Sequence, residues 1–218
     1  MATRHVLVEA GGAYAQATGR AVDVLAIGGV DAARRVQEGE AFDFVVLAAD
    51  VIARLAAAGR VRDPRDLARS EIAVAVARGA QPPDIESEGA LREAVLAARG
   101  VGYSSGPSGA HLAQLFGRWG IAPAIASRLV PAPPGTPVAT LIARGDVALG
   151  FQQRSELLGM PGIDIVGPLP ASVRCTTIFT GAVCTAAPQP AAASAFLAYV
   201  GSAAVDDTLR RHGMQPAR

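Results

Sequence analysis

The strongest constraint on the fold is a repeated alternation of short apolar runs with helical segments. Apolar runs at residues 22–27, 42–48 and 71–77 have the length and composition of buried strands, and helical periodicity fills the segments between them. Gly39 and Gly59 follow two of these helical segments, at the position where helices commonly end. This alternation predicts an α/β fold, with mainly parallel sheets flanked by helices.

Two strong breaks divide the chain. They lie at residues 78–84 (RGAQPPD) and 167–172 (GPLPAS), next to the long apolar runs 71–77 and 176–187. This arrangement suits a chain that crosses into a second lobe once and returns once, and small ligands commonly bind in clefts between lobes. The predicted lobes are residues 1–78 with 173–218 and residues 79–172, with hinges near 78–82 and 168–174.

Composition excludes several classes of partner. The net charge is +1 and no basic run exceeds a pair such as Arg34-Arg35, so we expect no nucleic-acid binding. No apolar run approaches the roughly 20 residues that cross a bilayer, so we expect no membrane insertion. The amino end has no signal-peptide pattern, which predicts a cytoplasmic protein if this start is genuine.

Two cysteines, Cys175 and Cys184, fall in one predicted strand. Their odd spacing places them on opposite faces, about 30 Å apart along an extended chain. A disulfide needs Cα atoms within about 7 Å, so we expect two free, mostly buried thiols.

Residues 99–119 form the most informative stretch: a short strand, a loop rich in Ser, Gly and Pro, and a helix. Ser108 is predicted to cap the helix, whose first N–H groups have no acceptor within the helix. Those donors and the positive end of the helix dipole favour an anion. The candidate binding residues here are Tyr103, Ser104, Ser105, Ser108 and Gly109.

Four further loops meet the rule that ligands bind at the carboxyl ends of strands in α/β sheets. They contribute Gly28, Gly29, Ser70, Val138, Gln152 and Gln153 as candidate ligand-binding residues. All these donors are uncharged, and no His, Cys or acidic cluster has metal-ligand spacing, so we expect neither metal nor cofactor. His111 is the one imidazole near the central loop and is a weak catalytic candidate.

Several segments resemble type 2 periplasmic binding proteins, and most closely their molybdate-binding (ModA-like) branch. They include GEAFDFVVLA, VGYSSGPSGAHLAQLFGRWGI, PVATLIARGDVALGFQQRSELL and RRHGMQP. The resemblance implies a two-lobed fold, a periplasmic location, and an oxyanion or small carboxylate delivered to the membrane component of an ABC transporter. By position, Ser108 and Gly109 match helix-start amides and Val138 a backbone donor.

Two departures from the molybdate pattern bear on the ligand. Gln153 stands where molybdate binders have a tyrosine, and Gly28-Gly29 where they have a serine. The GFQQ and SSGPSG variants resemble the branch that includes aconitate isomerase, in which small carboxylates are bound and in some members isomerised.

Three functions therefore stay open. The first is a monomeric solute-binding protein for a small anion, and the second is an isomerase of a small unsaturated carboxylic acid. The third is an effector-binding module of a transcription regulator, which ranks last because the sequence shows no helix-turn-helix pattern.

Overall fold

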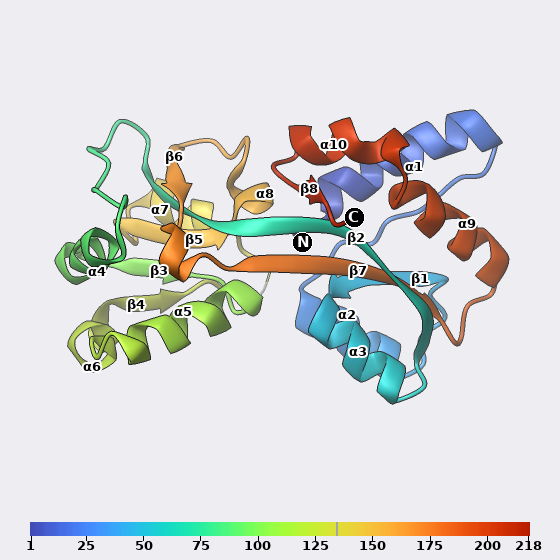
Figure 1. The fold of residues 1–218 in the computed structure, drawn as a ribbon, viewed down its shortest axis with the longest axis horizontal. Helices are drawn as coiled ribbons and strands as arrows, with labels where there is room; N and C mark the ends of the chain where they lie inside the picture. The colour runs from blue at the N-terminus through green and yellow to red at the C-terminus, as the bar shows by residue number, and fades with distance from the viewer. Residues whose placement is uncertain (134) are drawn as a thin grey trace. The chain divides into compact units, whose positions relative to one another are not determined.

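The computed structural model describes residues 1–133 and 135–218, which form two compact units (Figure 1). Unit 1 comprises Met1–Ser70 and Thr177–Arg218, and unit 2 comprises Glu71–Thr176. Residues 71–78 and 173–176, which the sequence groups with the first lobe, belong to unit 2, where the strand over 71–77 pairs. The positions of the hinges stay a prediction.

Unit 1 is a sheet covered by helices on both faces (Figure 1). Strand β1 (Phe44–Ala48) pairs antiparallel with β7 (Thr176–Cys184), which neighbours the first part of β2 (Val61–Ala77). The short β8 (Gln215–Pro216) pairs antiparallel with residues 68–69 of β2. The helices are α1 (Arg4–Thr18), α2 (Gly29–Gln37), α3 (Ala49–Ala57), α9 (Pro190–Val200) and α10 (Asp206–Arg211), with a 3-10 turn at Ala203–Val205.

Unit 2 contains a mixed sheet. Strand β3 (Val101–Tyr103) pairs in parallel with β4 (Leu129–Pro131) on one side and β5 (Leu149–Gln153) on the other. The second part of β2 runs antiparallel to β5 and to β6 (Ile163–Pro168). The helices are α4 (Glu88–Ala97), α5 (Pro107–Arg118), α6 (Ala122–Ile125), α7 (Val138–Arg144) and α8 (Arg154–Leu157), with 3-10 turns at Ala126–Arg128 and Ala171–Val173.

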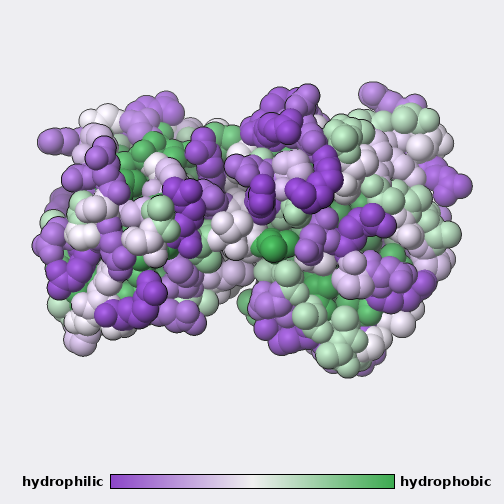
Figure 2. Space-filling model, in the orientation of Figure 1, coloured by the Kyte–Doolittle hydropathy of each residue, from purple (hydrophilic) through white to green (hydrophobic). Residues whose placement is uncertain are grey.

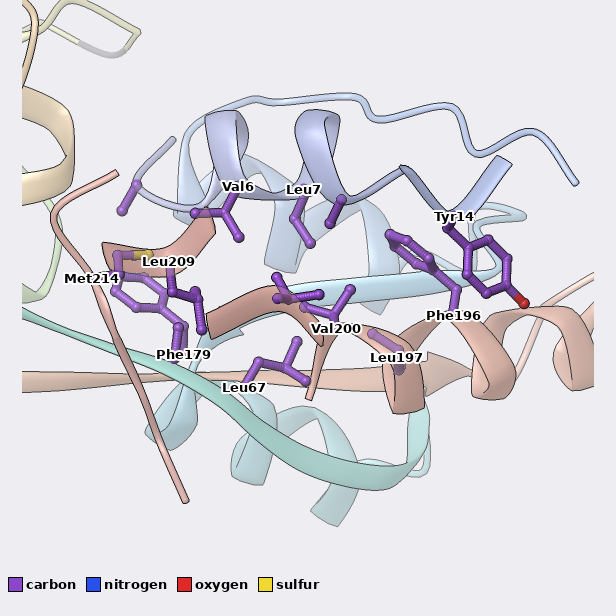
Figure 3. Packing of buried hydrophobic residues seen from close by; sticks show 14 of the residues in the cluster. Val6, Leu7, Tyr14, Leu67, Phe179, Phe196, Leu197, Val200, Leu209 and Met214 are labelled. Carbon is purple, nitrogen blue, oxygen red and sulfur yellow. The ribbon is translucent and has the colours of Figure 1, made fainter. Parts of the chain in front are cut away.

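The α/β fold class is confirmed, and the two faces of each sheet build separate cores. In unit 1, one core joins α1, α9 and α10 to β2 and β7, and Figure 3 shows side chains of this cluster. Tyr14 of α1 meets Phe196 of α9 edge to face, with ring centroids 5.4 Å apart. In unit 2, α4, α5 and α6 cover one face of the sheet and α7 covers the other.

Two segments differ from the sequence prediction. The predicted strand at 22–27 is wrong: this segment forms no ladder, because no strand among the described residues lies beside it. Conversely, the strand predicted over 71–77 begins earlier, at Val61, and includes the charged run 62–66, for which no strand is predicted. Pairing with neighbouring strands accounts for the longer strand.

Both cysteines are free, as expected, with Cys184 buried and Cys175 half-buried. Burial raises the pKa of the Cys184 thiol to about 11. Of the helices in the described part of the chain, none is long and apolar enough to cross a membrane.

Candidate functional site

The candidate residues of unit 2 gather at the carboxyl ends of β3 and β5. These strands are parallel neighbours, with Tyr103 opposite Phe151, so the segments that follow them emerge at the same edge of the sheet. The loop after β3 leads into α5, and β5 ends at Gln153. Helix α7 packs on both strands and begins at the same edge. The residues brought together are Tyr103, Ser104, Ser105, Ser108, Gly109, Val138, Gln152 and Gln153.

The start of α5 differs from the prediction in one respect. Ser108 is not the cap: the N-cap is Gly106, Pro107 is the first helical residue, and Ser108 lies inside the first turn. Proline is well suited to that first position, since it has no N–H group to leave without an acceptor. The Ser108 side chain instead hydrogen-bonds the Ser104 hydroxyl, with 2.7 Å between the two oxygens. The N–H groups of Ser108 and Gly109 are consequently the first that α5 presents to its loop.

Gly109 holds the loop close to the helix. A Cβ atom at this position would lie 1.9 Å from the Ser104 carbonyl oxygen and 3.1 Å from Cδ2 of Tyr103. Only glycine allows the Ser104 backbone to approach α5 in this way. Together with the hydrogen bond between Ser104 and Ser108, this contact fixes the loop over the helix start.

The start of α7 is tied to β5 by a buried hydrogen bond. The Val138 N–H donates to Oε1 of Gln152 at 2.8 Å, so this amide already has an acceptor in the structure. The Val138 side chain lies over two glycines, since a Cβ at Gly150 would be 2.8 Å from its Cγ1 and one at Gly102 would be 3.2 Å away. Small residues on β3 and β5 thus let α7 pack close to the sheet.

Three further polar residues near the end of β5 come shortly after Gln152 in the sequence: Gln153, Ser155 and Glu156. Gln153 and Ser155 are buried, and the Ser155 hydroxyl has no hydrogen-bond partner among the described residues. Burial raises the pKa of Glu156, whose carboxylate accepts a hydrogen bond from the Gln152 side chain. Sequence reasoning missed Ser155 and Glu156, because the short segment RSEL reads as a polar turn. The sequence does place Ser155 and Glu156 within three residues of Gln153, and that closeness could have marked them as candidates.

His111, the weak catalytic candidate, lies on the second turn of α5. Its Nε2 is 3.1 Å from the carbonyl oxygen of Val173, so this ring nitrogen is engaged with the backbone. This contact gives His111 a structural role within unit 2, because it links α5 to the backbone at Val173.

The remaining candidates belong to unit 1. Gly28 is the N-cap of α2 and Gly29 is its first residue. Ser70 is buried in β2, and its hydroxyl has no hydrogen-bond partner in the described ranges 1–133 and 135–218. A buried hydroxyl is normally satisfied, so Ser70 and Ser155 each have an unused donor and acceptor.

The chemistry of the unit 2 site is that of neutral hydrogen bonding. Its donors are backbone amides, serine hydroxyls and glutamine amides, and Glu156 is the nearby acid. The described residues include no group of three or more His, Cys, Asp or Glu side chains placed to hold a metal ion. An anion suits such a set, because each donor offers a partial positive charge without a counter-ion.

Comparisons with known proteins identify the family and the fold of this chain. The profile of the family described as "Bacterial extracellular solute-binding protein" matches residues 1–215. An aconitate isomerase from a Pseudomonas species is 36% identical over 214 residues, covering 94% of this chain and 80% of that protein.

Solved structures show the same fold at low sequence identity. The periplasmic molybdate-binding protein of Azotobacter vinelandii superposes with a TM-score of 0.81 at 17% identity, covering 99% of this chain and 96% of that one. The tungstate-binding protein TupA of Desulfovibrio alaskensis gives a TM-score of 0.66 at 14% identity, covering 93% of this chain and 87% of that one. The resemblance to periplasmic binding proteins, near the branch that includes aconitate isomerase, is confirmed.

Proposed function

Since this chain belongs to the bacterial extracellular solute-binding protein family, we propose that it binds a small carboxylate anion at the amino end of α5. The observation that carries the proposal is the packing of Gly109 against the Ser104 carbonyl, which holds a hydroxyl-rich loop over the helix start. An anion held by this loop would be stabilised both by the first free N–H groups of α5 and by the positive end of the helix dipole.

A carboxylate is favoured over an inorganic oxyanion by sequence similarity. The aconitate isomerase relative shares 36% of its aligned residues with this chain, twice the 17% shared with the molybdate-binding protein. The chain also lacks the serine and tyrosine expected of molybdate binders, having Gly28-Gly29 and Gln153 in their places. The amide of Gln153 can donate to a carboxylate oxygen as well as accept from a hydroxyl.

Thermal unfolding with a ligand panel tests binding. The panel contains cis-aconitate, trans-aconitate, citrate, molybdate, tungstate and sulfate. A ligand at 100 times its dissociation constant stabilises a protein by about 2.7 kcal/mol, which raises the melting temperature of a chain of this size by roughly 5–11 °C. We expect shifts with the carboxylates. A shift with the metal oxyanions alone would reject the carboxylate assignment, and no shift with any compound would reject the site.

A second candidate function is isomerisation of the bound carboxylate, and the identity to aconitate isomerase is what favours it. Moving a double bond or inverting its geometry by proton transfer needs a group that takes up and returns a proton. Glu156 suits that role better than His111, because burial favours its protonated form and His111 is engaged with the Val173 carbonyl.

Proton NMR of cis- and trans-aconitate incubated with the protein tests this activity. We expect Glu156→Gln to abolish turnover while keeping the ligand-induced thermal shift, and His111→Ala to retain turnover. Turnover that survives Glu156→Gln would remove Glu156 from the mechanism. Binding without interconversion in the unmodified protein would leave the solute-binding function alone, with a periplasmic location and an ABC-transporter membrane component as the proposed setting.

A further inference from the structure

Unit 1 contains an arginine-rich pocket that the proposed anion site does not use. Its volume is about 410 Å³, within the range of about 300–1,000 Å³ that small-molecule sites occupy. Figure 2 shows hydrophilic residues gathered over the part of the surface where α10 lies. The residues that line the pocket are Arg69, Asp206, Arg210, Gln215, Pro216 and Arg218.

The pairing of β2 with β8 places Arg69 on one wall of this pocket. Arg69 lies opposite Gln215 in the antiparallel ladder, so the two side chains leave the same face of the sheet. Ala68 and Ser70, the neighbours of Arg69 along β2, are buried, whereas Arg69 is exposed. The alternation of side chains along a strand therefore turns this guanidinium away from the core and towards the pocket.

Helix α10 forms the other wall. Leu209 is fully buried in the core of unit 1, whereas Asp206 and Arg210, one turn apart, line the pocket. After the helix the chain reverses at Gly213, whose φ of 71° favours glycine. The Met214 N–H then donates to the Leu209 carbonyl at 2.8 Å. This turn brings β8 back against α10 and closes the pocket between them.

Guanidinium groups outnumber carboxylates around the pocket. Asp206 is paired with two of the arginines, because Arg218 hydrogen-bonds its Oδ1 and Arg210 lies 3.7 Å from its Oδ2. Arg210 also donates to Asp207, at 2.8 Å. Arg69 makes no ion pair or side-chain hydrogen bond with any residue in the ranges 1–133 and 135–218 that the structure describes. One guanidinium thus borders the pocket without a counter-ion.

Arginines placed in this way suit a phosphate group. A guanidinium is always charged, and its planar fork of N–H groups can donate two parallel hydrogen bonds to phosphate. A phosphate monoester carries about −1.5 to −2 charges at pH 7 and has three acceptor oxygens, so it can engage more than one fork. The ion pairs of Arg210 lie on the surface and contribute little to stability, so its donors can be transferred to a bound phosphate at small cost.

We propose that this pocket binds a phosphate group, free or as part of a small molecule, with Arg69, Arg210 and the side-chain amide of Gln215 as donors. The candidate residues of the unit 2 site include no arginine, so the two sites differ in the chemistry by which they select an anion. The five non-hydrogen atoms of a phosphate ion occupy only a small part of about 410 Å³, which leaves room for an attached organic group.

Arginine side-chain NMR tests the proposal directly. Inorganic phosphate and glycerol 3-phosphate are titrated separately, and the Nε–H signals of the arginines are followed. We expect saturable shifts at Arg69 and Arg210, and binding at least tenfold weaker in Arg69→Gln. Arg69→Lys keeps the charge but removes the fork, so it should also weaken binding. Tighter binding of glycerol 3-phosphate would identify the ligand as an organic phosphate, and equal binding would identify it as free phosphate.

Arg62→Gln is the matched control, because it removes the same charge from the same strand outside the pocket. Seven extended residues separate Arg62 from Arg69 by about 23 Å, whereas salt screens charges over about 8 Å, so we expect its affinity to stay within about twofold. The proposal is overturned if neither compound gives a saturable shift at Arg69, or if Arg62→Gln weakens binding as much as Arg69→Gln.

The phosphate site and the proposed carboxylate site can fail independently. Gly109→Ala, which alters the loop over α5 in unit 2, should leave the phosphate-induced shifts at Arg69 and Arg210 unchanged. Arg69→Gln should likewise leave the thermal shift with cis-aconitate unchanged. Loss of the Arg69 shifts in Gly109→Ala would place phosphate in the unit 2 site and overturn the assignment to this pocket.

Discussion

Replacing Gly109 with alanine tests whether the contact between loop and helix builds the anion site. The added Cβ would lie 1.9 Å from the Ser104 carbonyl oxygen, whereas ordinary contacts begin near 3.4 Å, so the two segments must separate by about 1.5 Å. The obstacle is backbone and not the end of a flexible side chain, so no rotamer change relieves it. Overpacking of this kind costs about 1–3 kcal/mol and should lower the melting temperature by about 2–12 °C.

Gly117→Ala is the matched control, because it makes the same change in the same helix. Gly117 is exposed, and a Cβ there meets nothing within 4 Å. Alanine favours the helix by about 0.8–1 kcal/mol, so this variant should be slightly more stable. Thermal unfolding with and without cis-aconitate measures both effects, and we expect Gly109→Ala to lose the ligand-induced shift. If Gly109→Ala kept the parental melting temperature and the parental ligand shift, the reasoning about this site would be refuted.

Three further predictions follow from other contacts. Gln152→Leu removes the acceptor of the buried Val138 N–H and should lower the free energy of unfolding, measured in urea, by about 1–3 kcal/mol. An unfolding free energy equal to that of the unmodified protein would show that another group replaces this acceptor. Hydrogen bonds from Arg211 and His212 lower the pKa of Glu9 from 4.5 to about 2, so the folded state releases this proton more readily than the unfolded state. The resulting stabilisation is full above about pH 4.5 and is lost as the pH falls towards 2. Glu9→Gln should therefore make the free energy of unfolding depend less on pH between about 4.5 and 2. The same pH dependence in this variant as in the unmodified protein would contradict the prediction. Burial and a pKa of about 11 should protect Cys184 from iodoacetamide at pH 8 until the chain is unfolded, which mass spectrometry checks; labelling of the folded protein at this residue would contradict it.

The fold class was accessible from local patterns because its signals are short-range. Apolar runs such as 71–77 and helices ended by glycine depend on neighbours along the chain, and they correctly indicated an α/β fold. The helix after the central loop was also predicted, although its start was misplaced: Pro107, not the residue after Ser108, is the first helical position.

Pairing between strands was less accessible. Residues 22–27 have the composition of a buried strand, yet a strand exists only where another lies beside it, and β1 pairs on its far side with β7. Residues 61–66 show the reverse, since a charged run is held in β2 by partners that no local pattern reveals. Both errors arise because sheet structure depends on contacts between distant residues.

The candidate site divides in the same way. The types and order of its donors, from the serine-rich loop to Gln152 and Gln153, are properties of the sequence, because residue identity alone decides that they are neutral hydrogen-bonding groups. Folding decides which of those groups are engaged. Long-range packing gives the Val138 amide to Gln152, places the Ser104 carbonyl against Gly109, and buries Glu156 enough to raise its pKa, since each of these depends on distances between segments far apart in the chain.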